Sequence, residues 1–175
     1  MRNIFIGTLL VLLAAMARLL PHPANFTPLA AMALAGGVYF DKKFALVIPL
    51  AALVLSDLFL GFDSTVFFVY GSFVLIGLLG LWLKSHKKPL PIVASAAISS
   101  VLFFVITNFG VWMTGGGWSY PRTWQGVVEC YTLAVPFFRN TLAGDIVWTG
   151  VLFGLFELSA YTVRRFEKKP AEAHS

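Results

Sequence analysis

Six apolar segments follow one another along the 175-residue chain, with short polar, proline or glycine breaks between them. They cover residues 3–20, 27–40, 44–62, 64–83, 92–113 and 141–166. Most are close to the about 20 residues that a helix needs to cross a bilayer, and the second is shorter. Backbone groups in lipid must be hydrogen-bonded internally, and no segment shows the two-residue alternation of a membrane barrel. The pattern predicts an all-α polytopic membrane protein with about six transmembrane helices.

The amino-acid composition also indicates a membrane protein. Hydrophobic residues make up 58% of the chain and charged residues 12%, whereas a soluble domain has about 45–50% and about 25%. The chain therefore has too little polar surface to cover a soluble core. We expect one transmembrane helical domain over residues 1–166 and a polar tail over residues 167–175. The amino-terminal segment resembles a secretion signal, but the rest of the chain is equally hydrophobic, so we interpret it as the first helix.

The charged residues cluster between the apolar segments. The formal net charge is +5, and these positions are typical of membrane-flanking groups rather than of a surface that binds nucleic acid. With six spans, ten of the 13 Lys and Arg residues fall on one side, namely Arg2, Lys42, Lys43, Lys84, Lys87, Lys88, Arg164, Arg165, Lys168 and Lys169. Basic residues mark the cytoplasmic side of a membrane. We therefore expect both termini, and with them the tail, to be cytoplasmic.

Polar residues inside the spans are costly and mark candidate sites. With this orientation and a rise of about 1.5 Å per residue, six polar residues, four in the spans and two at the end of segment 118–140, fall in the outer third of the membrane. These are Arg18, Asp57, Asn108, Arg139, Asn140 and Asp145. The aromatic segment 118–140 is interpreted as a loop outside the spans. The layering predicts a solute-binding cavity open to the outside, with Asn25 as a further contact and Trp118, Tyr120 and Trp124 as its lid.

A purely structural role is the alternative for the same residues. Arg18 would pair with Asp57 and Arg139 with Asp145, while Asn108 would hydrogen-bond between helices.

Three other features allow two interpretations each. Ala31 and Ala35 form a small-xxx-small pair that either packs within the bundle or docks a partner protein. Cys130 is the only cysteine, and it either packs as a small apolar residue or ligates a soft metal. Glu157, predicted in the inner half, either relays protons or is paired within the bundle or at the interface. We predict no metal site, because His22 has no His or Cys partner at ligand spacing.

Catalytic signatures are missing from the sequence. It has no phosphate-binding glycine loop and no HExxH motif. His86 and His174 lie on the predicted cytoplasmic side, away from the polar layer, so no Ser/His/Asp set is expected. We expect neither an enzyme nor a bound cofactor.

Four stretches of the sequence resemble a family of small bacterial membrane proteins that are described as transport proteins of unknown function. They are residues 18–40 (RLLPHPANFTPLAAMALAGGVYF), 56–62 (SDLFLGF), 107–112 (TNFGVW) and 136–142 (PFFRNTL) with the following Gly144-Asp145. The resemblance extends over nearly the whole chain. It implies a multi-pass protein of the bacterial inner membrane with a role in transport.

In size, number of spans and its Ala-rich early helix pair, the chain also resembles the S components of energy-coupling-factor vitamin transporters. That resemblance implies binding of a vitamin-like solute near the outer face and a transmembrane coupling protein with ATPases as partner. Ala31 and Ala35 are similar to the small-residue motif of S components, which lies on their first helix instead. In this hypothesis the arginines contact an anionic group of the solute, and the aromatic side chains stack on its ring. Two alternatives are an autonomous ion- or proton-coupled carrier with Glu157 as relay, and a structural membrane protein without a ligand.

Overall fold

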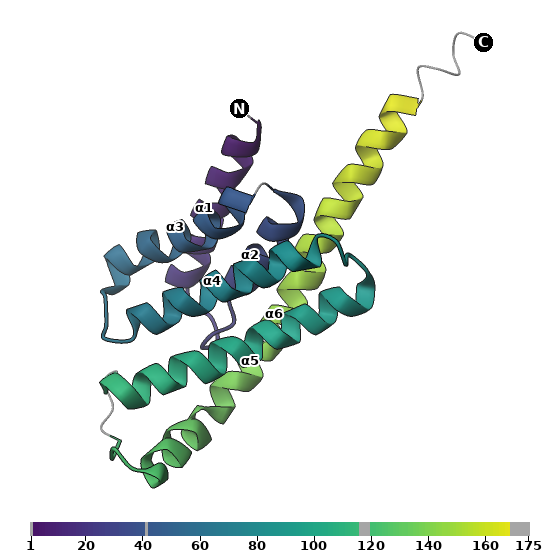
Figure 1. The fold of residues 1–175 in the computed structure, drawn as a ribbon. Helices are drawn as coiled ribbons and strands as arrows, with labels where there is room; N and C mark the ends of the chain where they lie inside the picture. The colour runs from purple at the N-terminus through teal and green to yellow at the C-terminus, as the bar shows by residue number, and fades with distance from the viewer. Residues whose placement is uncertain (1, 41, 116–119, 169–175) are drawn as a thin grey trace, which may run out of the picture.

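In the part of the chain that the structure describes, the regular elements are all helices (Figure 1). The structure, a computed structural model, describes residues 2–40, 42–115 and 120–168. In chain order these ranges hold α1 (Arg2–Leu19), α2 (Leu29–Tyr39), α3 (Lys42–Leu60), α4 (Val66–Leu83), α5 (Pro89–Thr114) and α6 (Trp124–Lys168). The expectation of an all-α protein is confirmed, and the number of helices in the described ranges is the number of predicted spans.

Proline and glycine mark several of the helix ends. Pro89 is the first residue of α5, where its missing N–H would have no partner in any case. Gly115 ends the same helix with a φ of 90°, and Gly61 follows α3 with a φ of 91°. These values lie in the left-handed region that glycine adopts without strain.

Within the described residues, four helices are long and apolar enough to cross a membrane. They are α3, α4, α5 and the part of α6 over Trp124–Val163. The other two have shorter apolar stretches, Gly7–Leu19 in α1 and Leu29–Tyr39 in α2. The helices are therefore compatible with the predicted membrane location.

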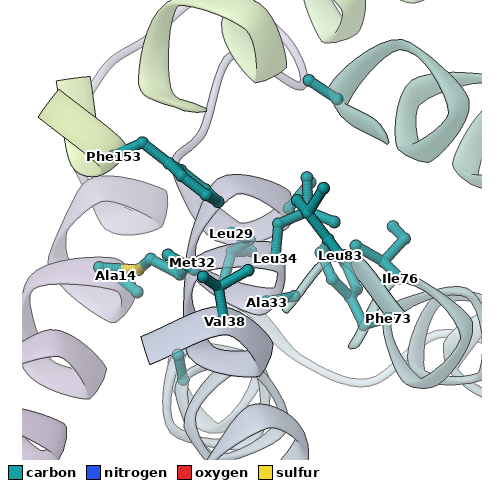
Figure 2. Close-up of a cluster of buried hydrophobic side chains, with 14 of the residues drawn as sticks. Ala14, Leu29, Met32, Ala33, Leu34, Val38, Phe73, Ile76, Leu83 and Phe153 are labelled. Carbon is teal, nitrogen blue, oxygen red and sulfur yellow. The ribbon is translucent and has the colours of Figure 1, made fainter. Parts of the chain in front are cut away.

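The short helix α2 forms the centre of the molecule. Its 11 residues span about 16 Å, and those from Leu29 to Val38 are all buried. It packs against α3, α4, α5 and α6, while α1 packs against α3. Figure 2 shows its side chains meeting Phe73 and Ile76 of α4 and Phe153 of α6. The Ala- and Gly-rich segment is thus a core helix surrounded by longer ones.

The sequence-based boundary of the last helix was wrong. A span was expected over residues 141–166 after a loop at 118–140, but α6 begins at Trp124 and runs unbroken to Lys168. Pro136 lies inside it, as prolines in membrane helices often do when neighbouring helices support the backbone. The helix is about 68 Å long, and its carboxyl-terminal part extends beyond the other helices in Figure 1. Asp145 therefore lies about six turns into α6, not in its first turn.

Candidate functional site

An ion pair joins the end of α1 to the last turns of α3. Arg18 Nη1 lies 2.7 Å from Asp57 Oδ1 and donates a 2.6 Å hydrogen bond to Ser56 Oγ. The second carboxylate oxygen of Asp57 accepts a 2.8 Å hydrogen bond from the hydroxyl of Tyr70 on α4. The Asp57 side chain is only 10% exposed. The predicted Arg18–Asp57 pair is therefore present, and it connects three helices.

Asp145 lies deeper in the bundle than this ion pair. It is 3% exposed, and its Oδ2 accepts a 2.6 Å hydrogen bond from Ser100 Oγ. Because Ser100 is near the middle of α5, Asp145 lies beside the middle of that helix and away from its ends. The alternative pairing with Arg139 is not found among the described residues. Arg139 and Asp145 are six positions apart, so they point about 120° away from each other around α6, and Arg139 is exposed.

A cavity of about 250 Å³ separates these two features. We call it the central cavity. Its polar lining is Arg18, His22, Asn25, Thr27, Thr141 and Asp145. Its apolar lining is Leu29, Ala30, Leu53, Leu60, Val69, Phe73 and Phe103. All six helices and the loop at residues 20–28 contribute, so the fold brings residues from distant parts of the sequence to one site.

The loop at residues 20–28 forms one side of the central cavity. His22 and Asn25 are exposed there, and His22 Nδ1 forms a 2.6 Å hydrogen bond with the carbonyl oxygen of Leu20. Asn25 has a φ of 62°, a conformation that asparagine tolerates better than most residues. The loop packs on α6, because a Cβ added to Gly144 would lie 3.1 Å from Phe26 Cα. This contact fixes the loop beside Asp145.

A second hollow, of about 290 Å³, lies beside the central cavity. Arg18, Asp57 and Asp63 line it together with residues that follow α3. Arg18 borders both spaces. The ion pair is thus at the boundary between two hollows.

Other predicted site residues lie elsewhere. Asn108 and Tyr120 line a separate cavity of about 440 Å³ with Cys130. The Asn108 side chain bonds the Phe104 carbonyl of its own helix at 2.7 Å, not another helix. Cys130 is 2% exposed, and its Sγ lies 3.5 Å from the Asn108 carbonyl oxygen, so it packs between α5 and α6.

The predicted aromatic lid is not over the central cavity. Trp124 is 75% exposed and lines an outer groove of α6, while Tyr120 belongs to the cavity of Asn108. Trp118 lies outside the described residues. Arg139 and Asn140 line neither the central cavity nor the hollow beside it. The aromatic walls are instead Phe73 and Phe103, whose ring centroids are 5.6 Å apart.

Three residues of the site were missed in the sequence. Thr27 and Thr141 line the central cavity, and Ser100 donates a hydrogen bond to Asp145. Thr141 could have been found, because it is four residues before Asp145 and therefore on the same helix face. Nothing in the sequence marks Ser100 among the other serines of α5.

Ala31 and Ala35 pack inside the bundle. They are 0% and 2% exposed, and α2 is buried from Leu29 to Val38. In this structure they present no surface to a partner protein.

Glu157 lies at the other end of the bundle. Its Oε1 lies 2.6 Å from Lys87 Nζ and accepts a 2.6 Å hydrogen bond from the Tyr39 hydroxyl. The Glu157 side chain is 53% exposed. Among the described residues, no three His, Cys, Asp or Glu side chains gather in a way that could hold a metal ion.

One family model matches residues 1–169 of the chain, and its description is a family of unknown function (DUF6580). The match extends over almost the entire sequence, and the chain belongs to this family. No curated protein and no solved structure matches it.

Proposed function

We propose that this member of the DUF6580 family is a membrane uptake protein that binds a small, vitamin-like solute in the central cavity. The observation that carries the proposal is the convergence of Arg18, Asn25 and Asp145 on one cavity of about 250 Å³. These residues come from α1, the loop at 20–28 and α6. A concave, largely apolar space with a few convergent polar groups is the usual form of a small-molecule site.

The size of the cavity limits the solute. Pockets for drug-sized ligands measure about 300–1,000 Å³, so a space of about 250 Å³ fits a compact molecule. Phe73 and Phe103 provide an apolar surface for a ring, while Asn25 and Thr27 add hydrogen-bonding groups from the loop at residues 20–28.

The proposed topology has six spans in the bacterial inner membrane, with both termini cytoplasmic. Its support is the grouping of the lysines. Lys84 Nζ lies 3.4 Å from the Phe40 carbonyl oxygen, so the turn after α2 and the turn after α4 are at the same end of the bundle. Lys42 and Lys43 follow Phe40 and Asp41 in the sequence, so they lie at this end as well. Since basic turns favour the cytoplasm, the loop at residues 20–28 faces outward.

Energy for uptake would come from a partner, as the similarity to S components implies. That partner would be a transmembrane coupling protein with ATPases. It would dock on an outer surface of the bundle, because Ala31 and Ala35 are enclosed.

A purely structural protein is the second candidate. The observation that favours it is the closed set of contacts among Arg18, Ser56, Asp57 and Tyr70. Such a set stabilises a bundle without any ligand.

Thermal unfolding of the purified protein in detergent, with a panel of small vitamins, separates the two candidates. A ligand at 100 times its Kd adds about 2.7 kcal/mol to the stability of the folded state. We expect at least one compound to raise the midpoint of the wild type and of Arg139→Ala, which lies outside the cavity, but not of Asn25→Ala. Equal responses of the two variants, or no response to any compound, would contradict solute binding in the central cavity.

A further inference from the structure

The charges around the central cavity do not balance. Arg18 is already paired with Asp57 at 2.7 Å and bonded to Ser56, so this pair is close to neutral. His22, Asn25, Thr27 and Thr141, also in the lining, offer hydrogen-bonding groups rather than a fixed charge. The carboxylate of Asp145 is the charge that remains.

Asp145 has hydrogen-bonding capacity left over. A carboxylate has two oxygens with about four acceptor positions, and within the described part of the chain Ser100 Oγ fills one of them. Two hydroxyls lie four residues from it on the same face of α6. That of Thr141 donates to the Phe137 carbonyl oxygen at 2.9 Å, and that of Thr149 makes no hydrogen bond within the described residues. Asp145 is 97% buried, since 3% is exposed.

A buried carboxylate without a cation is energetically costly. It must be neutralised by a proton, or it must meet a positive charge that enters the site. An ammonium group in the central cavity would supply both the charge and the missing donors.

The apolar part of the cavity suits the remainder of such a molecule. Phe73 and Phe103 line the same space as Asp145, with their rings inclined at 58°. Aromatic faces attract cations and pack against apolar rings. One compact solute can therefore contact the carboxylate and the two rings together.

We propose that the central cavity selects small organic amines in their protonated form, with the ammonium group against Asp145 and the apolar body against Phe73 and Phe103. This proposal rests on the proposed function. It replaces the expectation of an anionic solute, which depended on Arg18 and Arg139 being available.

Three probes of similar size test it, with the purified protein in detergent at pH 7. Benzylamine carries an ammonium group, benzoate a carboxylate and benzyl alcohol no charge on the same ring. We expect benzylamine to raise the unfolding midpoint of the wild type, and the other two to have much weaker effects. Asp145→Asn should weaken benzylamine binding by about 10- to 100-fold, since it removes a charge-assisted hydrogen bond. Glu157→Gln removes a carboxylate outside the cavity and should bind benzylamine like the wild type.

The outcomes separate this inference from the proposed function. If benzoate or benzyl alcohol binds best and Asn25→Ala loses that binding, the cavity binds solutes but amine selectivity is wrong. If none of the probes and none of the vitamins binds, the proposed function itself fails and amine selectivity fails with it. If Asp145→Asn does not fold, Asp145→Glu keeps the charge and should retain the preference for benzylamine over benzoate. Loss of that preference in a folded Asp145→Glu protein would contradict the assignment.

Discussion

Gly37 of α2 and Gly80 of α4 lie against each other, backbone to backbone. A Cβ added to Gly80 would be 2.8 Å from the carbonyl oxygen of Leu34 and 2.9 Å from that of Ala33. A Cβ on Gly37 would meet the backbone of Gly80 and Leu81. Small residues allow such close approach of helices in lipid. This contact helps to hold α2 at the centre of the bundle, and Leu29 and Ala30 at the start of the same helix line the central cavity.

Gly80→Ala is therefore expected to destabilise the bundle. The new methyl group would meet backbone atoms that cannot move aside, and overpacking of this kind costs about 1–3 kcal/mol. Gly71→Ala in the same helix is the matched control, because nothing lies within 4 Å of its added Cβ. Thermal unfolding in detergent should show a lower midpoint for Gly80→Ala and an equal or higher midpoint for Gly71→Ala. Similar midpoints for the two variants would show that the helices are not in contact there.

Breaking the pair of Arg18 and Asp57 should cost more than removing both partners. Arg18→Met leaves a largely buried carboxylate with Tyr70 as its remaining partner, and loss of one member of a buried pair costs about 3–5 kcal/mol. In Arg18→Met/Asp57→Asn, the uncompensated charge is gone, so part of the stability should return. A double-mutant cycle on the free energy of unfolding measures this coupling. Additive effects of the two substitutions would contradict a direct interaction.

Glu157 should contribute little to stability or transport. Its contact with Lys87 joins side chains that are 53% and 39% exposed, and exposed ion pairs contribute about 0–1 kcal/mol. We expect Glu157→Gln to change the free energy of unfolding by no more than about 1 kcal/mol. Lys88→Met, in the same basic turn, serves as the control for loss of one exposed charge. An autonomous proton-coupled carrier predicts the opposite, since Glu157→Gln would then abolish uptake driven by a pH gradient in liposomes.

The first five helices were predictable because their ends carry local signals. Lys42 and Lys43 mark the start of α3, and Pro89 and Gly115 mark the two ends of α5. The start of α6 was not predictable in this way. Aromatic residues such as Trp124 and Tyr131 are typical of a membrane interface. The segment that contains them was therefore interpreted as a loop, although it is the first part of a helix that continues through Pro136.

The same misplaced boundary explains which site residues were right. Arg18 and Asp57 precede α6, and their ion pair was anticipated as the structural alternative. Asp145 was placed about five turns too close to the start of its helix, because the helix begins at Trp124 and not at residue 141. Its contact with Ser100 depends on how α5 and α6 pack, and hydropathy alone does not give the register between two helices. Arg139 illustrates the limit of depth as a criterion, because depth does not say which way a side chain faces around the helix.

Labelling of single cysteines tests the orientation on which outward binding depends. In a Cys130→Ala background we expect Ala24→Cys, in the exposed loop at residues 20–28, to react on intact cells with a membrane-impermeant maleimide. Lys42→Cys, at the start of α3, and Ser85→Cys, in the turn after α4, should react only after the cells are permeabilised, because basic turns remain in the cytoplasm. The background without added cysteine is the control for labelling. Reaction of Lys42→Cys from outside would mean that α2 does not return the chain across the membrane, and reversed labelling of all three positions would place the central cavity on the cytoplasmic side.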